Sequence, residues 1–490
     1  MINFNIFLLI NLFFPVIGII LIFYLNNKQK RVIKLVALNF SSFSFIGFLI
    51  LWSVFDKSTI MFQFTYKISL ILLFNLNYFI GIDGISLFFI LLTTMLIPVC
   101  LLISWTNIKY LYKEYLILFL LLDFLLINVF YVIDLLFFYI FFESILLPMF
   151  LIIGVWGSRE RKILANYYFF IYTLFGSLIM LLGIVFIYDQ IGATDYLILL
   201  NFSFNKIEQI FLWFSFFLSF ASKVPMLPVH LWLPEAHVEA PTAGSVILAG
   251  VLLKLGTYGF IRFSVVLFPF GAFFFTPLIY SLSILAIIYA SLTAIRQSDF
   301  KKIIAYTSIA HMNLVLLGIF SYNIIGLEGA IYQSINHGFV SSALFILIGI
   351  VYDRYRTRSI HYFGGLASIM PLFITIFLFF TMANIGFPGT GNFLGEFLIF
   401  VSSFKINIIL TVFSALGLII SAIYGLWLFN RVSFGNLKLQ YINRFLDLNF
   451  REFLSFLPLF AGSIITGVYS GILLIPIHYN INYLIEFIYL

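Results

Sequence analysis

The chain has 490 residues, of which 63% are hydrophobic and only 9% carry a charge. An ordinary soluble domain carries about 25% charged residues, so this composition excludes a soluble enzyme or binding domain. The single cysteine, Cys100, lies within an apolar run, which excludes a disulfide framework or a cysteine-based metal site. The sequence therefore indicates a polytopic membrane protein with no separate soluble domain.

Apolar segments long enough to cross a bilayer as helices recur along the whole chain. A spanning helix needs about 20 mostly apolar residues, and we count 14 such segments. In chain order they are residues 5–24, 36–54, 84–104, 116–133, 135–155, 165–187, 210–232, 243–260, 276–294, 303–320, 328–351, 372–401, 408–429 and 456–475. Residues 55–82 are too polar and too aromatic to be predicted as a span. The predicted fold class is an all-α polytopic membrane protein.

Two of the predicted spans, the seventh and the twelfth, contain helix-breaking residues. The segment 221–259 holds four of the chain's 13 prolines, and the sequence NIGFPGTG interrupts the twelfth span at 384–391. Broken backbone at membrane depth is tolerated only inside protein or beside water. His230 and His237 flank the first break, where we expect them to satisfy freed backbone groups. Interruptions at corresponding positions in two halves are typical of inverted-repeat transporters.

The two breaks lie five spans apart, which divides the chain into two units. Because five is odd, the second unit is expected to be inverted in the membrane relative to the first. We therefore predict two inverted five-helix repeats, helices 4–8 and 9–13, with helices 7 and 12 discontinuous. The expected divisions are residues 1–112 for the first three helices, 113–262 and 263–430 for the two repeats, and 431–490 for a loop and helix 14.

The basic residues are distributed unevenly between the two sides of the membrane. When each loop is numbered by the helix it follows, odd-numbered loops hold 19 lysines and arginines and even-numbered loops hold five. Basic loops remain on the cytoplasmic side or its organellar equivalent, so the odd loops are expected there and both termini on the opposite side. The net charge of +7 is thus a topology signal and does not indicate nucleic-acid binding.

Seven ionisable side chains lie inside predicted spans, where a charge costs about 2.5–3.5 kcal/mol on insertion scales. They are Asp123, Glu143, Lys223, Lys254, His311, His337 and Glu396. A membrane protein retains such groups because they pair, exchange protons, or both. We predict that this set transfers protons, with Glu143 and Lys223 as a charge-coupled pair in which a change at one partner alters the other.

These residues also have structural interpretations. Glu143 could pair with a lysine without any transport role, and Lys223 could cap carbonyls freed by the first break. Lys254 could extend to the membrane surface, although its central position disfavours this. The two histidines could be hydrogen-bonded core residues, and nothing besides the pair indicates haem ligation. Glu396 could cap exposed amides after the second break.

Eight segments between about Gly81 and Asn430 carry a family resemblance. They are GIDGISLFF (81–89), FFESILLPMF (141–150), GVWGSRERK (154–162), KVPMLPVHLWLPEAHVEAPTAGSVILAG (223–250), LLKLGTYGF (252–260), KKIIAYTSIAHMNLV (301–315), NHGFVSSALF (336–345) and GEFLIF (395–400). The chain resembles the subunit 4 family of mitochondrial NADH:ubiquinone oxidoreductase (complex I), one of the antiporter-like proton-translocating subunits. The segment 223–250 is highly specific.

The resemblance implies a proton-pumping subunit with 14 spans in two inverted five-helix units. The residues that match the family's proton-transfer positions are Glu143, Lys223, Lys254, His311, His337 and Glu396. Sibling subunits commonly carry a lysine at the last position, so Glu396 favours the subunit 4 branch. The resemblance implies no cofactor or metal in this chain, with FMN, iron–sulfur clusters and ubiquinone in other subunits.

The resemblance also implies partners and a location. The expected partners are other membrane-arm subunits of complex I, including antiporter-like subunits 2 and 5, and lipids, with no nucleic acid. The expected location is the mitochondrial inner membrane, with the basic odd loops on the matrix side and both termini in the intermembrane space.

Two other functions are compatible with parts of the pattern. The first is a subunit of a stand-alone multisubunit cation/proton antiporter, against which the mitochondrial-type segments argue. The second is a non-pumping scaffold subunit with a vestigial polar axis, against which the retention of all the charged positions argues.

Overall fold

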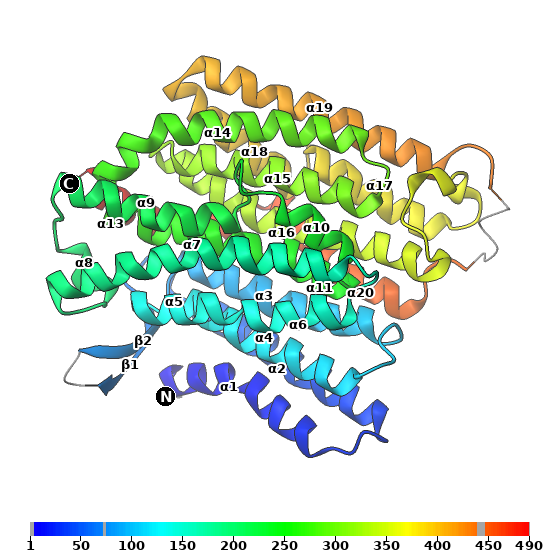
Figure 1. Cartoon of the computed structure of the whole chain (residues 1–490), viewed down its shortest axis with the longest axis horizontal. Coiled ribbons are helices and arrows are strands. Elements are labelled where there is room, and N and C mark those ends of the chain that lie inside the picture. The colour runs from blue at the N-terminus through cyan, green and yellow to red at the C-terminus, as the bar shows by residue number, and fades with distance from the viewer. Residues whose placement is uncertain (1–3, 72–74, 439–445, 490) are drawn as a thin grey trace.

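The computed structural model describes residues 4–71, 75–438 and 446–489 and consists mainly of long helices packed side by side (Figure 1). Arg444, one of the basic loop residues counted above, lies outside the described residues. The helices up to the first break are α1 (Phe4–Tyr24), α2 (Lys30–Val54), α3 (Gly84–Ser104), α4 (Tyr112–Tyr131), α5 (Leu135–Ser144), α6 (Leu146–Trp156), α7 (Lys162–Ile191), α8 (Tyr196–Leu200) and α9 (Lys206–Lys223).

The remaining helices complete the bundle. They are α10 (Trp232–Glu239), α11 (Thr242–Ile247), α12 (Leu253–Gly259), α13 (Val265–Leu267), α14 (Pro269–Arg296), α15 (Phe300–Ile319), α16 (Ile324–Tyr355), α17 (Pro371–Ile385), α18 (Gly391–Ile406), α19 (Ile408–Ser433), α20 (Phe450–Val468) and α21 (Gly471–Tyr489). Within the described part of the chain, 12 helical segments are long and apolar enough to cross a membrane. This confirms a mostly helical, multi-pass membrane protein, while the total of 14 spans stays a prediction.

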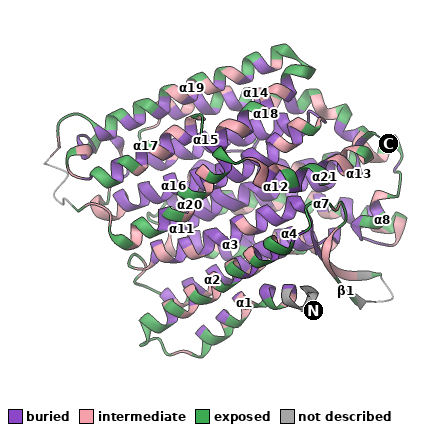
Figure 2. Ribbon diagram, turned by 180° about the vertical axis from the view of Figure 1, so that it is seen from behind, coloured by how far each residue is buried: buried purple, intermediate pink, exposed green. Residues whose placement is uncertain are grey.

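The bundle is built around a buried centre. Residues of α16 and of the segment Thr242–Leu267 are almost all buried, whereas the outer helices α2 and α19 alternate buried and exposed residues (Figure 2). A helix that is apolar all round is expected to be fully enclosed in protein or lipid. The segment Thr242–Leu267 and α16 are therefore enclosed by protein, and the outer helices expose part of their apolar surface.

The region 55–82, of which residues 72–74 are not described, contains two paired strands that the all-helical prediction did not include. Strand β1 (Gln63–Ile71) pairs antiparallel with β2 (Leu76–Ile82), with Lys67 opposite Phe79. Alternating polar and apolar residues favour a strand with one covered face. The Lys67 ammonium lies 2.9 Å from the Asp195 carboxylate and ties the hairpin to the start of α8. The hairpin projects at the same end of the bundle as the two chain ends (Figure 1).

The breaks in the seventh and twelfth predicted spans are present in the structure. Helix α9 ends at Lys223 and α10 begins at Trp232, while α17 ends at Ile385 and α18 begins at Gly391. Two further irregularities were not predicted. The fifth span bends at Ile145, between α5 and α6, and the eighth contains the π-helical segments η2 (Leu248–Leu252) and η3 (Phe260–Ser264).

The chain ends in two helices rather than one. We expected a last span at 456–475, but the backbone turns at Tyr469, and α21 continues to Tyr489. Both α20 and α21 contact α3 and α16. The C-terminal region therefore covers the centre of the bundle over two consecutive helices.

Candidate functional site

Lys254 is fully buried in the middle of the bundle and is held by two contacts. Its ammonium group donates a hydrogen bond to the Ala249 carbonyl oxygen at 2.5 Å and lies 3.0 Å from Nδ1 of His337. The carbonyl belongs to η2, and a π-helical turn is a register change that often occurs at functional sites. Because the side chain points inward, the structure argues against its extension to the membrane surface.

The two histidines continue from Lys254 toward an acid. The ring centroids of His337 on α16 and His311 on α15 are 5.6 Å apart. Nδ1 of His311 lies 3.1 Å from Oε1 of Glu396 on α18. Four sequence-predicted residues from four elements thus form one line, Lys254–His337–His311–Glu396. In each histidine the other ring nitrogen, Nε2, is buried without a hydrogen-bond partner among the described residues.

Glu396 accepts hydrogen bonds from side chains. Besides His311, the Gln333 amide donates to Oε1 at 3.2 Å. The Ala383 carbonyl at the end of α17 accepts from the backbone amide of Gly386 at 3.2 Å and from the side-chain amide of Asn392 at 3.1 Å. Gly386 caps α17 with a φ of +83°, and a Cβ there would lie 2.5 Å from the second carboxylate oxygen. The break thus makes room for the carboxylate, and Glu396 caps no backbone amide among the residues that the structure describes.

Lys223, at the end of α9, faces an aromatic ring. Its ammonium group lies 4.6 Å from the centroid of Phe142 and has no hydrogen-bond partner among the described residues. The freed carbonyls at this break have other donors: the Trp232 indole donates to Ser222 O at 2.8 Å, and the Met226 amide donates to Ala221 O at 3.1 Å. The structure therefore does not support a role for Lys223 as a carbonyl cap.

Glu143 lies at the bend between α5 and α6, beside Lys223. Its charge is close enough to act on that ammonium group, and the reverse holds. Both carboxylate oxygens are buried without a hydrogen-bond partner among the described residues, although the Ser177 hydroxyl is nearby. The structure places Glu143 within electrostatic range of Lys223, but among the described residues the two side chains do not form a direct ion pair.

Asp123 is buried but stands apart from the other six residues. It accepts a hydrogen bond from the Ser44 hydroxyl at 3.2 Å, so it lies between α4 and α2. Asp134, outside the spans, is buried as the N-cap of α5 and accepts from the Thr194 hydroxyl at 2.7 Å. Burial raises the pKa of this carboxyl, and its hydrogen bonds oppose that shift. Neither aspartate contacts the line from Lys254 to Glu396.

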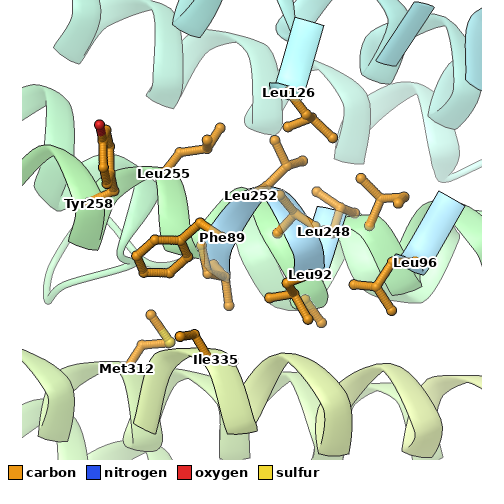
Figure 3. Close-up of a cluster of buried hydrophobic side chains, with 14 of the residues drawn as sticks. Phe89, Leu92, Leu96, Leu126, Leu248, Leu252, Leu255, Tyr258, Met312 and Ile335 are labelled. Carbon is orange, nitrogen blue, oxygen red and sulfur yellow. The ribbon is translucent and has the colours of Figure 1, made fainter. Parts of the chain in front are cut away.

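Apolar side chains surround the helix that carries Lys254. Leu248, Leu252 and Leu255 form one cluster with Leu92 of α3 and Met312 of α15 (Figure 3). Such an enclosure is costly for an unpaired polar group, because no water replaces its lost hydrogen bonds. The contacts of the Lys254 ammonium group within the line therefore offset most of this cost.

The sequence analysis missed Lys301, which it assigned to a loop. Lys301 is buried in the first turn of α15, where its ammonium group donates to Ala240 O at 2.7 Å and to the Ser245 hydroxyl at 3.1 Å. His237 lies where the charges of Lys301 and Lys254 both act on it. Its ring stacks on Phe345, with centroids 4.5 Å apart. The polar axis thus extends beyond Lys254 toward a basic loop.

The expected role of the two flanking histidines differs in the structure. Both ring nitrogens of His237 and of His230 lack a hydrogen-bond partner among the described residues, although His230 faces the Pro228 carbonyl. His237 therefore does not satisfy the backbone as predicted, whereas His230 lies beside a carbonyl of the break. The sequence could have marked His237 as a candidate site residue, because it is an ionisable residue beside a break. Its neighbours could not have been predicted, because they come from distant parts of the chain.

The sequence analysis also missed two buried ion pairs, because it assigned their arginines to loops. Arg262 in η3 pairs with Asp83, whose carboxylate also caps α3 through the Ser86 amide. Arg358 lies 3.4 Å from Glu239 and donates to the Val238 carbonyl. These pairs fasten the segments GIDGISLFF and EAHVEAP to the bundle, which gives those motifs a structural role.

No group of three or more histidines, cysteines or acids able to hold a metal ion occurs among the residues searched, which are the described ones. The absence of a cofactor from this chain stays a prediction.

The fold and the buried line define an antiporter-like membrane protein. Residues 133–423, more than half of the chain, match the family model described as "NADH:quinone oxidoreductase/Mrp antiporter, TM". The fold is also similar to a chain of respiratory complex I from Thermus thermophilus with bound NADH, with a TM-score of 0.88, 27% identity and coverage of 98% of this chain and 99% of that one. A chain of an archaeal membrane-bound sulfane sulfur reductase shares the fold, with a TM-score of 0.83 at 21% identity over 94% and 75% of the two chains.

Curated relatives are more specific. NADH-ubiquinone oxidoreductase chain 4 of Arabidopsis thaliana is 55% identical over 96% of this chain and 95% of the relative. The protein of the same name from Chondrus crispus is 56% identical over 97% and 96%. The chain belongs to the NADH-ubiquinone oxidoreductase chain 4 family.

Proposed function

We infer that this chain is a proton-translocating membrane subunit of an NADH–ubiquinone oxidoreductase, complex I. The observation that carries this inference is the line Lys254–His337–His311–Glu396, which has direct contacts at both ends and adjacent histidine rings at its centre, inside a shell of apolar side chains. Similarity to named relatives over nearly the whole chain supports assembly into that complex. The redox energy would come from other subunits, which would hold FMN, iron–sulfur clusters and ubiquinone.

The geometry supports a sequence of proton transfers. Protonated Lys254 would donate to Nδ1 of His337 and become neutral, since the two nitrogens are already within hydrogen-bond distance. The resulting imidazolium would release a proton from Nε2 toward His311, with water bridging the gap between the rings. His311 would then protonate the Glu396 carboxylate through Nδ1. Histidine suits this relay because it gives and takes protons near neutral pH.

The pair Glu143–Lys223 would control this transfer. The positive charge of Lys223 makes protonation of Lys254 less favourable. The negative charge of Glu143, beside Lys223, weakens this effect. When Glu143 is neutralised or moves away, the Lys223 charge would act more strongly on Lys254. Lys254 would then release its proton toward Glu396. Helix α9, which carries Lys223, packs directly against α12, which carries Lys254.

The finer topology is part of this proposal. We propose 14 spans, with helices 4–8 and 9–13 as inverted repeats within residues 113–262 and 263–430. The breaks at α9–α10 and α17–α18, five predicted spans apart, support the repeats. The basic odd loops would face the mitochondrial matrix and both termini the intermembrane space. Neighbouring antiporter-like subunits 2 and 5 and membrane lipids would cover the outer helices.

The two alternatives are weighed by different observations. A stand-alone cation/proton antiporter shares the family model, but the relatives with more than 50% identity are named as chain 4 of NADH-ubiquinone oxidoreductase. A non-pumping scaffold would need no line of titratable groups in mutual contact. The line argues against it.

The variant Glu143→Gln tests the proposed control. It removes the charge of the carboxylate at nearly constant shape. We expect the complex to assemble, as seen on native gels, but to lose proton pumping and the coupled reduction of quinone. Glu114→Gln is the matched control, because Glu114 is an exposed acid in the first turn of α4. If Glu143→Gln pumps at the normal rate, the coupling role is wrong.

A further inference from the structure

A second group of buried polar side chains lies where α1 packs against α2 and α4, away from the line of titratable residues (Figure 1). Its acid is Asp123, which is fully buried and forms no ion pair among the described residues. Both polar atoms of the Asn11 side chain are also fully buried and lack a hydrogen-bond partner among those residues. Unsatisfied polar groups at this depth are costly, so their arrangement calls for an explanation.

Helix α2 brings the Asn11 side chain close to the acid. A Cβ on Gly47 would lie 1.8 Å from Oδ1 of Asn11, so the Asn11 amide rests directly on the backbone of α2. Ser44 precedes Gly47 by three residues and therefore lies on the same face of α2. The Ser44 hydroxyl lies 3.2 Å from Oδ2 of Asp123, but its one proton can also go to the Ser41 carbonyl at 2.7 Å. The amide and the carboxylate thus approach the same short stretch of α2.

A proline in α1 frees a further oxygen beside the amide. Pro15 lies inside α1 and is buried. Because proline has no N–H, the backbone carbonyl of Asn11, four residues earlier, loses its helical donor. Asn11 therefore offers two oxygens to the interface, one from its side chain and one from its backbone.

The pairing of α1 with α4 sets Asp123 at the level of Pro15. The two helices are antiparallel, because the start of α4 donates hydrogen bonds to carbonyls at the end of α1. Further along, a Cβ on Gly18 would lie 3.1 Å from the Leu120 side chain. About one turn beyond this contact, α1 reaches Pro15 and α4 reaches Asp123. The freed carbonyl and the carboxylate therefore meet at the same depth.

This group of residues has more acceptors than donors and carries one negative charge. A proton on the carboxyl could join only one pair of oxygens, whereas a metal cation contacts several at once. Hard cations bind carboxylate and carbonyl oxygens, and membrane transporters coordinate sodium with carbonyls freed from a helix. A monovalent ion balances the charge of Asp123, whereas a divalent ion leaves an excess positive charge in the bundle.

We propose that this interface binds one sodium ion, held by the carboxylate of Asp123 and by the side-chain and backbone oxygens of Asn11. The ion neutralises the buried acid and fastens α1 and α2 to α4. Neither Asp123 nor Asn11 contacts the line from Lys254 to Glu396 among the described residues. The inference therefore goes beyond the proposed function and does not depend on it.

Binding of radioactive sodium to the purified intact complex, in a background of choline chloride, tests the site. We expect Asp123→Asn, which removes the charge and keeps the shape of the side chain, to bind one sodium ion fewer per complex than the native chain. Glu114→Gln is the matched control, because it removes an exposed acid from the same helix, and it should bind as much sodium as the native chain. Equal sodium binding by Asp123→Asn and the native complex would overturn the proposal and leave a bound proton as the compensation for the acid.

The variant Pro15→Ala separates a ligand role from a structural role. The alanine N–H restores the helical donor to the Asn11 carbonyl and removes that oxygen from the site, while it improves α1 as a helix. We expect the affinity for sodium to fall several-fold and the amount of assembled complex to stay unchanged. Pro98→Ala in α3 is the control for replacing a proline inside a helix, and it should keep the native affinity. Unchanged affinity in Pro15→Ala, or equal weakening in both variants, would contradict the assignment.

Discussion

Lys254 shows how a single charged residue is accommodated in an apolar interior. Its ammonium group reaches the Ala249 carbonyl, which lies in the π-helical turn, and His337, 83 positions further along the chain. A buried charge without such partners would shift toward its neutral form or destabilise the fold. The same contacts that make Lys254 tolerable also give its proton somewhere to go. Structural compensation and proton transfer therefore depend on the same atoms.

Replacing Lys254 by alanine separates the pumping role from a scaffold role. The change removes the contacts of the ammonium group with the Ala249 carbonyl and with Nδ1 of His337, and a buried polar group left without a partner costs about 1–3 kcal/mol. We expect the complex to assemble but to move fewer protons per electron. Lys405→Ala is the control, since Lys405 is an exposed lysine in the last turn of α18. An unchanged proton-to-electron ratio in Lys254→Ala would favour the scaffold interpretation.

At the scale of the helices, the interruptions position the polar side chains. The break between α17 and α18 leaves Gly386 in a left-handed conformation, and the absence of a side chain there leaves space for Glu396. Gly389 in the same break is also left-handed, with a φ of +95°, but nothing lies within 4 Å of where its Cβ would be. The two glycines share a left-handed backbone but differ in what a methyl group would meet.

Gly386→Ala and Gly389→Ala exploit this difference. Each places a non-glycine residue in the left-handed region, at a cost of about 1–2 kcal/mol. Only the methyl group at position 386 would meet the Glu396 carboxylate, 2.5 Å away, and displace it from His311. We expect similar thermal stabilities for the two variants and reduced proton pumping in Gly386→Ala alone. Equal pumping rates would show that the exact position of Glu396 is unimportant.

Some of these elements could be predicted from the sequence, for clear reasons. Long apolar segments and clustered prolines are local signals, so the spans and the breaks near Pro225 and Pro388 were found. The interruption at Ile145 and the π-helical turns were not, because each is a local change in backbone hydrogen bonding that leaves composition unaltered. The β1–β2 hairpin was missed because the search was for spans, and its strands are too short and polar to qualify.

The sequence predicted which residues belong to the candidate site but not how they are arranged. The ionisable residues stand out in apolar spans, whereas their order depends on helix packing across long sequence separations. Lys301 and Arg358 were assigned to loops because their sequence neighbours are polar, although both side chains turn into the bundle. Asp123 satisfied the same sequence criterion as Glu396, but α4 directs it toward α2.

At the scale of the whole molecule, the polar axis occupies the most deeply buried helices. Segments Thr242–Leu267 and α16 form the centre, and the outer helices expose apolar side chains to the surroundings (Figure 2). Lys254 and His337 are in direct contact, as are His311 and Glu396, but no hydrogen bond joins Lys223 to Lys254 or His337 to His311 among the described residues. Transport along the whole line therefore requires water in those two gaps. The central claim is therefore that a hydrated path joins the pair Glu143–Lys223 to Glu396 through Lys254.

A map of the intact complex at a resolution that shows ordered water tests this claim most directly. We predict water molecules between Lys223 and Lys254 and between the rings of His337 and His311, which together complete a path from Glu143 to Glu396. Dry contact between apolar side chains in those two gaps would contradict the account.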